Sequence, residues 1–122
     1  EVKGMRDKGY DKWIDLASYV WDLIESAGNM RDDLTVIITF HAETVRDDMG
    51  YAFTHIKTNG RKLEKLVLES KMTTVVWAVR QDDKYKFFLS ADGSTCKVPM
   101  GSFDTDECDN DIMLVIKALE AY

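Results

Sequence analysis

The apolar positions near the start of the chain recur at the spacing of an α-helix. Seven of them share one stripe of such a helix: Trp13, Leu16, Ala17, Val20, Leu23, Ile24 and Ala27. Asp11 is a suitable N-cap, and Gly28-Asn29 is a suitable end because both residue types tolerate positive φ. The pattern therefore predicts a helix over residues 11–27, after a flexible N-terminal segment over residues 1–9.

From residue 34 onward every second residue is apolar, which is the spacing of a half-buried strand. This alternation predicts a strand over residues 34–43 with one strongly apolar face. Asp47, Asp48 and Gly50 favour a turn, and residues 51–58 are the expected antiparallel return strand.

Three further strands are predicted from β-branched and aromatic content, over residues 73–80, 85–90 and 94–98. Turns at residues 81–84 and at Asp92-Gly93 separate them.

Residues 61–70 fit two structures. Asn59-Gly60 supplies the two positive-φ positions of a type I′ hairpin, which favours a partner strand for residues 51–58. The segment is also rich in Lys, Glu and Leu, which favours a short helix. We favour the strand and keep the helix as the alternative.

The chain ends on a second helical repeat, whose apolar positions are Cys108, Ile112, Val115, Ile116 and Leu119. Asp104 with Glu107 three residues later resembles a capping box. The elements together predict an α+β fold: an N-terminal helix, an antiparallel sheet of about five strands and a C-terminal helix. We expect both helices to pack on one face of the sheet.

Composition supports one globular domain over residues 10–122. The 122 residues are 45% hydrophobic and 31% charged with one proline, which excludes a disordered or low-complexity chain. Runs of apolar residues are far shorter than the roughly 20 needed to span a bilayer. No charged start followed by an apolar stretch opens the sequence, so we expect no signal peptide. We expect a cytoplasmic protein and no membrane partner. The first residue, Glu1, leaves open a mature exported form or a domain cut from a larger chain.

The acidic balance points to a basic partner. Sixteen Lys and Arg against 22 Asp and Glu give a net charge of −6, which argues against nucleic acid. Five acids fall within eight residues: Asp104, Asp106, Glu107, Asp109 and Asp111. An EF-hand is excluded, since Asp109 and Val115 stand where Gly and Glu are needed. Three interpretations of the run stay open: a solvated helix start, a surface that steers a basic protein, and a weak site for a divalent cation.

Other candidate contacts are acids in predicted turns and two aromatic anchors. The turn acids are Asp47, Asp48, Asp82 and Asp83, and the anchors are Trp21 and Tyr51. With Tyr19, Phe53 and Tyr85, these anchors form either an exposed patch or the second face of the sheet.

Cofactor and nucleophile signatures are missing. Cys96 and Cys108 form either one disulfide or two free thiols, and their spacing fits no zinc pattern. The acids around Cys108 oppose a reactive thiolate. No nucleophile elbow, Walker loop or dinucleotide-binding motif is present, so we predict no catalytic residue, metal or cofactor.

Two functional hypotheses follow. The first is a non-enzymatic domain, monomeric or homodimeric, that binds a basic protein partner. Toxin-neutralising immunity proteins and antitoxins are examples of that size and charge. Variants of this hypothesis are a secretion chaperone or a host-factor-binding domain cut from a larger, even viral, polypeptide. The second is a ligand or enzyme site around His41 and His55, which we expect on neighbouring strands near Glu43.

Overall fold

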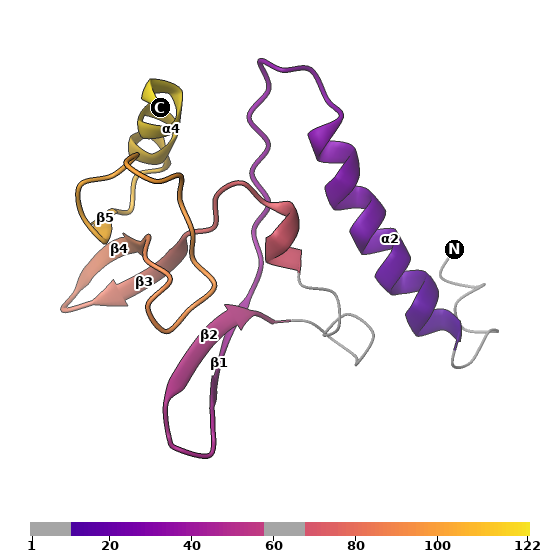
Figure 1. The fold of residues 1–122 in the computed structure, drawn as a ribbon, viewed down its shortest axis with the longest axis horizontal. Helices are drawn as coiled ribbons and strands as arrows, with labels where there is room; N and C mark the ends of the chain where they lie inside the picture. Colours follow the sequence, from indigo (N-terminus) through magenta and orange to yellow (C-terminus); the bar gives the residue numbers. More distant parts are fainter. Residues whose placement is uncertain (1–10, 58–67) are drawn as a thin grey trace. The chain divides into compact units, whose positions relative to one another are not determined.

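The computed structural model describes residues 11–57 and 68–122, in the order of elements shown in Figure 1. Contacts group these residues into two compact units. We call residues 11–40, 57 and 68–71 the helical unit, and residues 41–56 and 72–122 the sheet unit. The predicted N-terminal segment and the predicted hairpin at Asn59-Gly60 lie outside the described residues.

The helical unit contains one long helix, α2 (Asp11–Gly28), and a 3₁₀ turn, η1 (Leu68–Lys71). The helix confirms the prediction from the apolar stripe over residues 11–27 and ends at the predicted Gly28. Ile24 of α2 and Leu68 of η1 are both buried. Because residues 68–70 lie in η1, the end of the 61–70 segment is not in the strand that we favoured. The remainder of that segment lies outside the described residues.

The first hairpin of the sheet unit joins β1 (Ala42–Arg46) to β2 (Ala52–Ile56), with Val45 opposite Phe53. Asp47 Oδ1 closes the connecting loop by accepting from two backbone N–H groups, of Met49 and Tyr51, each at 2.9 Å. The predicted turn and return strand are therefore confirmed.

The strand predicted over residues 34–43 is wrong in position. The chain is extended there, but ladder pairing begins only at Ala42. Alternating β-branched residues favour an extended backbone, whereas a strand also needs a partner. The hairpin loop fixes the register of β1. Residues 34–41 pair with no strand in the part of the chain that the structure describes.

A second sheet has the order β3 (Trp77–Gln81), β4 (Lys84–Phe88) and β5 (Glu107–Asp109), all antiparallel. Asp82 and Asp83 form the β3–β4 turn with positive φ values of 54° and 62°, as a type I′ turn requires. The two strands and the turn confirm the central parts of the predicted ones.

The five strands thus form two small sheets rather than one. The predicted last strand over residues 94–98 is instead a connector that makes single bridges, Ser94 to Thr54 and Lys97 to Val75. It lies between β2 and the start of β3, which it joins by backbone hydrogen bonds. A strand of such short pairing does not extend either sheet.

The C-terminal helix, α4 (Ile112–Ala121), begins later than the repeat predicts. Asp111 is its N-cap and accepts from Met113 N at 2.9 Å. The capping box expected at Asp104 and Glu107 is therefore wrong. Cys108 fits the helical stripe by spacing, yet it lies in β5 opposite Phe87, where it still reaches the core.

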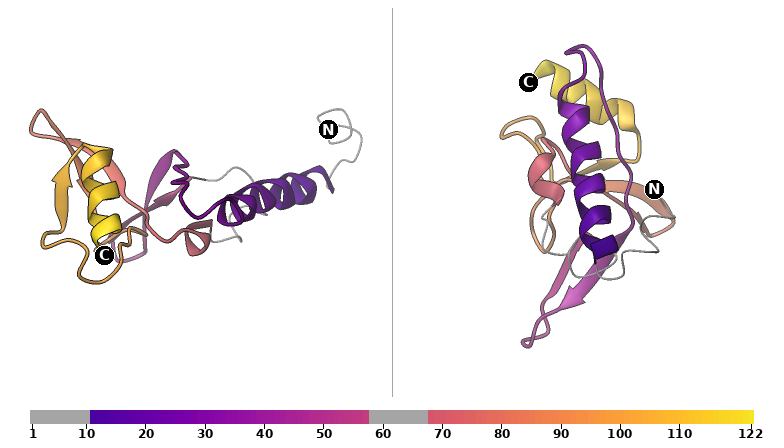
Figure 2. Two further views of the ribbon diagram at one scale, coloured as in Figure 1. Left: turned by 90° about the horizontal axis from the view of Figure 1, so that it is seen from above. Right: turned by 90° about the vertical axis from the view of Figure 1, so that its right-hand side faces the viewer.

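The core of the sheet unit lies between α4 and the three-stranded sheet. Its buried members are Phe87, Leu89 and Val115, with Val76, Val98, Phe103, Cys108 and Leu119 packed around them. Figure 2 shows α4 beside this sheet. The placement of α2 on the same face stays a prediction. None of the described helices has the length and apolarity needed to cross a membrane.

Candidate functional site

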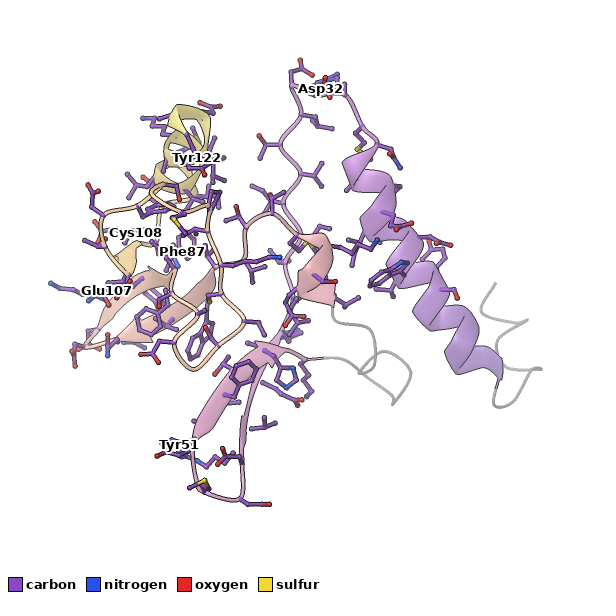
Figure 3. All side chains as sticks on the ribbon, in the orientation of Figure 1. Asp32, Tyr51, Phe87, Glu107, Cys108 and Tyr122 are labelled. Atoms are coloured by element: carbon purple, nitrogen blue, oxygen red, sulfur yellow. The ribbon has the colours of Figure 1, made fainter. Side chains whose placement is uncertain are left out.

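The acidic run, residues 104–111, is a loop followed by β5 and a helix cap; we call it the acidic segment. Its backbone is held to the sheet: β5 pairs with β4, and Leu89 N donates to Asp106 O at 2.9 Å. Thr105 Oγ1 donates to Glu107 O at 2.7 Å. All five acidic side chains are exposed. The segment therefore presents carboxylates from an ordered backbone. In Figure 3 the labels Glu107 and Cys108 mark its position.

Two of the five carboxylates have structural roles. Glu107 accepts a hydrogen bond from Lys86 Nζ at 2.7 Å. This bond and the negative charge of Glu107 raise the pKa of Lys86. Asp111 caps α4. The carboxylates of Asp104, Asp106 and Asp109 make no ion pair or hydrogen bond with any residue that the structure describes. These three are available for a partner.

Metal-ligating side chains and thiols were the other candidates for a chemical site. Across residues 11–57 and 68–122, no group of three or more His, Cys, Asp or Glu is placed to hold a metal ion. Cys96 and Cys108 are both free thiols. Burial raises the pKa of both, and the charges of Asp109 and Asp111 raise that of Cys108 further.

The predicted turn acids divide in the same way. Asp47 is used in closing the β1–β2 loop, while Asp48 is exposed beside it. Asp83 pairs with Arg80 at 2.9 Å, and Asp82 is exposed at its positive-φ position. Asp47 and Asp83 are thus occupied by local contacts, which leaves Asp48 and Asp82 as the exposed acids of the two turns.

An apolar surface lies on the β1–β2 hairpin, and we call it the hairpin patch: Val45, Met49, Tyr51 and Phe53, all exposed. Figure 3 shows Tyr51 near the loop end of the hairpin. The patch borders a shallow open hollow of about 560 Å³, whose far side is Asp92-Gly93. Backbone bonds from Thr54 N to Gly93 O and from Thr95 N to Thr54 O hold that side in place.

Sequence reasoning selected Tyr51 but did not select Val45, Met49 or Asp92 for this surface. Val45 and Phe53 occupy opposed positions of the ladder, so they lie on the same face as cross-strand neighbours. Once the turn is assigned, every second residue on each strand falls on this face: 43, 45 and 47 on one side and 51, 53 and 55 on the other. That pattern in the sequence could have identified the face.

The predicted anchor Trp21 has a lysine side chain over its ring. The Lys71 ammonium lies 4.5 Å from its ring centroid and also pairs with Glu25, so the half-buried ring already has a cation over it. Trp21 belongs to the helical unit and Tyr51 to the sheet unit. A patch that unites Trp21 with Tyr51 therefore stays a prediction. Tyr19 and Tyr85 are exposed, and the Arg80 guanidinium lies 5.8 Å from the Tyr85 ring centroid.

The two histidines are not brought together by strand pairing. His55 lies opposite Glu43, and its Nε2 is 3.4 Å from Glu43 Oε1, while its Nδ1 is 2.8 Å from Ile56 O. The rings of His55 and Phe53 are stacked, with 6.3 Å between their centroids. His41 is exposed one residue before β1. Both nitrogens of His55 thus face oxygen atoms within the hairpin.

Comparison of the chain with protein-family models, with curated proteins and with solved structures found no match. The function is therefore argued from the site alone.

Proposed function

We propose that this chain is a non-enzymatic binding domain whose acidic segment engages a basic protein. The observation that carries the proposal is the availability of Asp104, Asp106 and Asp109. A solvated helix start was the competing explanation of the acidic run, and it accounts only for Asp111 because α4 begins at Ile112. Three exposed carboxylates on an ordered loop and strand remain without a structural role.

Electrostatics supports this use of the segment. Exposed charges of one sign attract an oppositely charged partner over about 10 Å at ordinary ionic strength, and so speed and orient encounter. The net charge of −6 over the whole chain adds a long-range attraction for the same basic partner.

The hairpin patch supplies the second element of an interface. Charges steer association, whereas most binding energy comes from a few apolar and aromatic side chains that become buried. Tyr51 and Phe53 are such side chains, and the acids Asp48 and Asp92 lie in the adjoining turns. An aromatic centre with acidic neighbours suits a partner whose surface has an apolar site ringed by Lys and Arg.

Among binding proteins of this size and charge, toxin-neutralising immunity proteins and antitoxins are the class we propose, acting in the cytoplasm. A secretion chaperone and a host-factor-binding domain of a larger polypeptide are variants of the same activity. All of them use binding without catalysis. The raised pKa values of Cys96 and Cys108 argue only against a cysteine nucleophile. The analogy rests on size and charge.

A ligand or enzyme site around the histidines is the less favoured hypothesis. It needs His41 and His55 to converge, whereas His55 contacts Glu43 and the Ile56 carbonyl instead. The hollow beside the hairpin patch is lined by other residues.

The test is capture of the partner from a lysate of the source organism at low and at high salt. Immobilised wild-type chain is compared with the variant D104N/D106N/D109N. The control variant D22N/D32N/E120Q also removes three negative charges, but from exposed positions outside the acidic segment. We expect one basic protein on the wild type and on the control, lost at high salt and depleted on the acidic-segment variant. Equal capture by both variants contradicts the proposal.

A further inference from the structure

Residues 34–40 are an extended, mostly apolar segment without charge, and all of its side chains except the half-buried Ile38 are exposed. The sequence is Leu-Thr-Val-Ile-Ile-Thr-Phe, and Ile37 at its centre is 55% exposed. Leu34, Val36 and Phe40 are exposed as well. Monomeric proteins seldom expose an uninterrupted apolar strand of this length, because such strands pair with others.

The backbone of the segment is equally unpartnered. From Thr35 to His41, no backbone group takes part in a hydrogen bond among the residues that the structure describes. The segment runs directly into β1 (Figure 1), which pairs on one side with β2 and, among residues 11–57 and 68–122, has no ladder partner on the other. An extended segment with free N–H and C=O groups is a template for another strand.

The order of side chains is symmetric about Ile37. Leu34 matches Phe40, Thr35 matches Thr39, and Val36 matches Ile38. When two such strands pair antiparallel about a two-fold axis at Ile37, every residue meets one of its own kind. Threonine faces threonine and large apolar faces large apolar, which are favourable cross-strand pairs. One step further out, Asp33 meets His41, an acid opposite a basic group.

We propose that residues 34–40 pair with the same segment of a second copy of this chain, antiparallel and centred on Ile37. A strand of a different protein gives no reason for this symmetry. In an isologous dimer, by contrast, each residue faces its counterpart on the other side of Ile37, so the symmetry gives matched pairs. The absence of charge in the segment also spares a dimer of an acidic chain from repulsion at the axis. This inference is independent of the basic partner proposed above.

The test uses charge at the axis, where a residue faces its own copy. I37K places two ammonium groups opposite each other and I37E two carboxylates, so each variant alone is expected to weaken dimerisation at least about tenfold. An equimolar mixture of the two variants places Lys opposite Glu and is expected to restore the dimer. M100K, at an exposed apolar position outside both residues 34–40 and the hairpin patch, is the control and keeps the wild-type association.

Sedimentation velocity measures the result, since the monomer has a mass of 14.0 kDa. A wild-type and mixed-variant dimer with monomeric single variants supports the pairing, and restoration in the mixture also shows that both variants fold. The proposal is overturned if the wild type is monomeric at its highest attainable concentration, as pairing of the segment within one chain requires. Dimers of I37K and I37E equal to those of the wild type overturn it too.

Discussion

Lys86 and Glu107 pair diagonally across β4 and β5, with Lys86 Nζ 2.7 Å from Glu107 Oε1. In the ladder register Lys86 lies directly opposite Asp109, yet its ion pair is with Glu107. This choice neutralises one acid of the acidic segment and leaves Asp109 exposed. The relationship explains how an ordered strand carries surplus negative charge.

The Lys86–Glu107 pair predicts a pH-dependent contribution to stability. Glu107 raises the pKa of Lys86 above its ordinary 10.5, so the folded state holds this proton more tightly than the unfolded state. The stabilisation is therefore present at lower pH and lost as the pH rises through the raised pKa. We expect urea unfolding to show K86Q less stable than wild type at neutral pH, with the difference vanishing in strong base. K84Q, at the exposed start of β4, serves as control; a K86Q deficit independent of pH contradicts this account.

Replacing the helix cap predicts a local loss of stability. D111A removes the acceptor for Met113 N, and such caps contribute about 1 kcal/mol to the free energy of unfolding. D104A is expected to change it by less than about 0.5 kcal/mol, because Asp104 is exposed and has no capping contact. Urea unfolding of both variants is the measurement. The reverse ranking is what the capping box at Asp104 requires.

Cys108 should react slowly with thiol reagents at neutral pH. Burial raises its pKa first, and the charge of Asp109 adds to the shift, so little thiolate is present. D109N is expected to speed alkylation of Cys108 by roughly twofold or more, since lowering the pKa raises the thiolate fraction. Mass spectrometry of the peptide that contains Cys108 measures the rate, with D104N as control. An unchanged rate in D109N contradicts a contribution of the Asp109 charge to the slow reaction.

Truncation of the hairpin patch should weaken partner binding without unfolding the protein. Y51A removes an exposed ring, so the free energy of unfolding is expected to change by less than about 0.5 kcal/mol. Loss of an interface aromatic typically weakens binding about tenfold or more. Titration calorimetry with the captured partner measures the affinity. Y19A, on α2, removes an equally exposed tyrosine and should leave it unchanged; equal effects of both substitutions argue against the patch.

Local patterns predicted the elements that depend on local interactions. The helix over residues 11–27 follows from one apolar stripe, and the Asp82-Asp83 turn follows from residues that tolerate positive φ. The errors concern partners that are distant in sequence. Cys108 is four residues before Ile112 and fits a helix, yet its pairing with Phe87 keeps it in a strand. Likewise, the alternation over residues 34–43 predicts an extended chain but not its partner.

The candidate site was predictable in composition but not in detail. The sequence alone identifies five neighbouring acids, and only the fold separates Asp111 and Glu107, which have structural contacts, from Asp104, Asp106 and Asp109. The hairpin patch depended on the register that places Val45 opposite Phe53. Pairing at a distance therefore decides both what the acids do and where the apolar side chains gather.

The most direct test of the account is the salt dependence of the association rate with the captured partner. Stopped-flow measurements compare the wild type with D104N/D106N/D109N and with the charge-matched control D22N/D32N/E120Q. We predict that at low salt the acidic-segment variant associates about tenfold more slowly than the control, and that the difference disappears at high salt. Identical rates and salt dependence for the two variants would show that the acidic segment does not steer the partner.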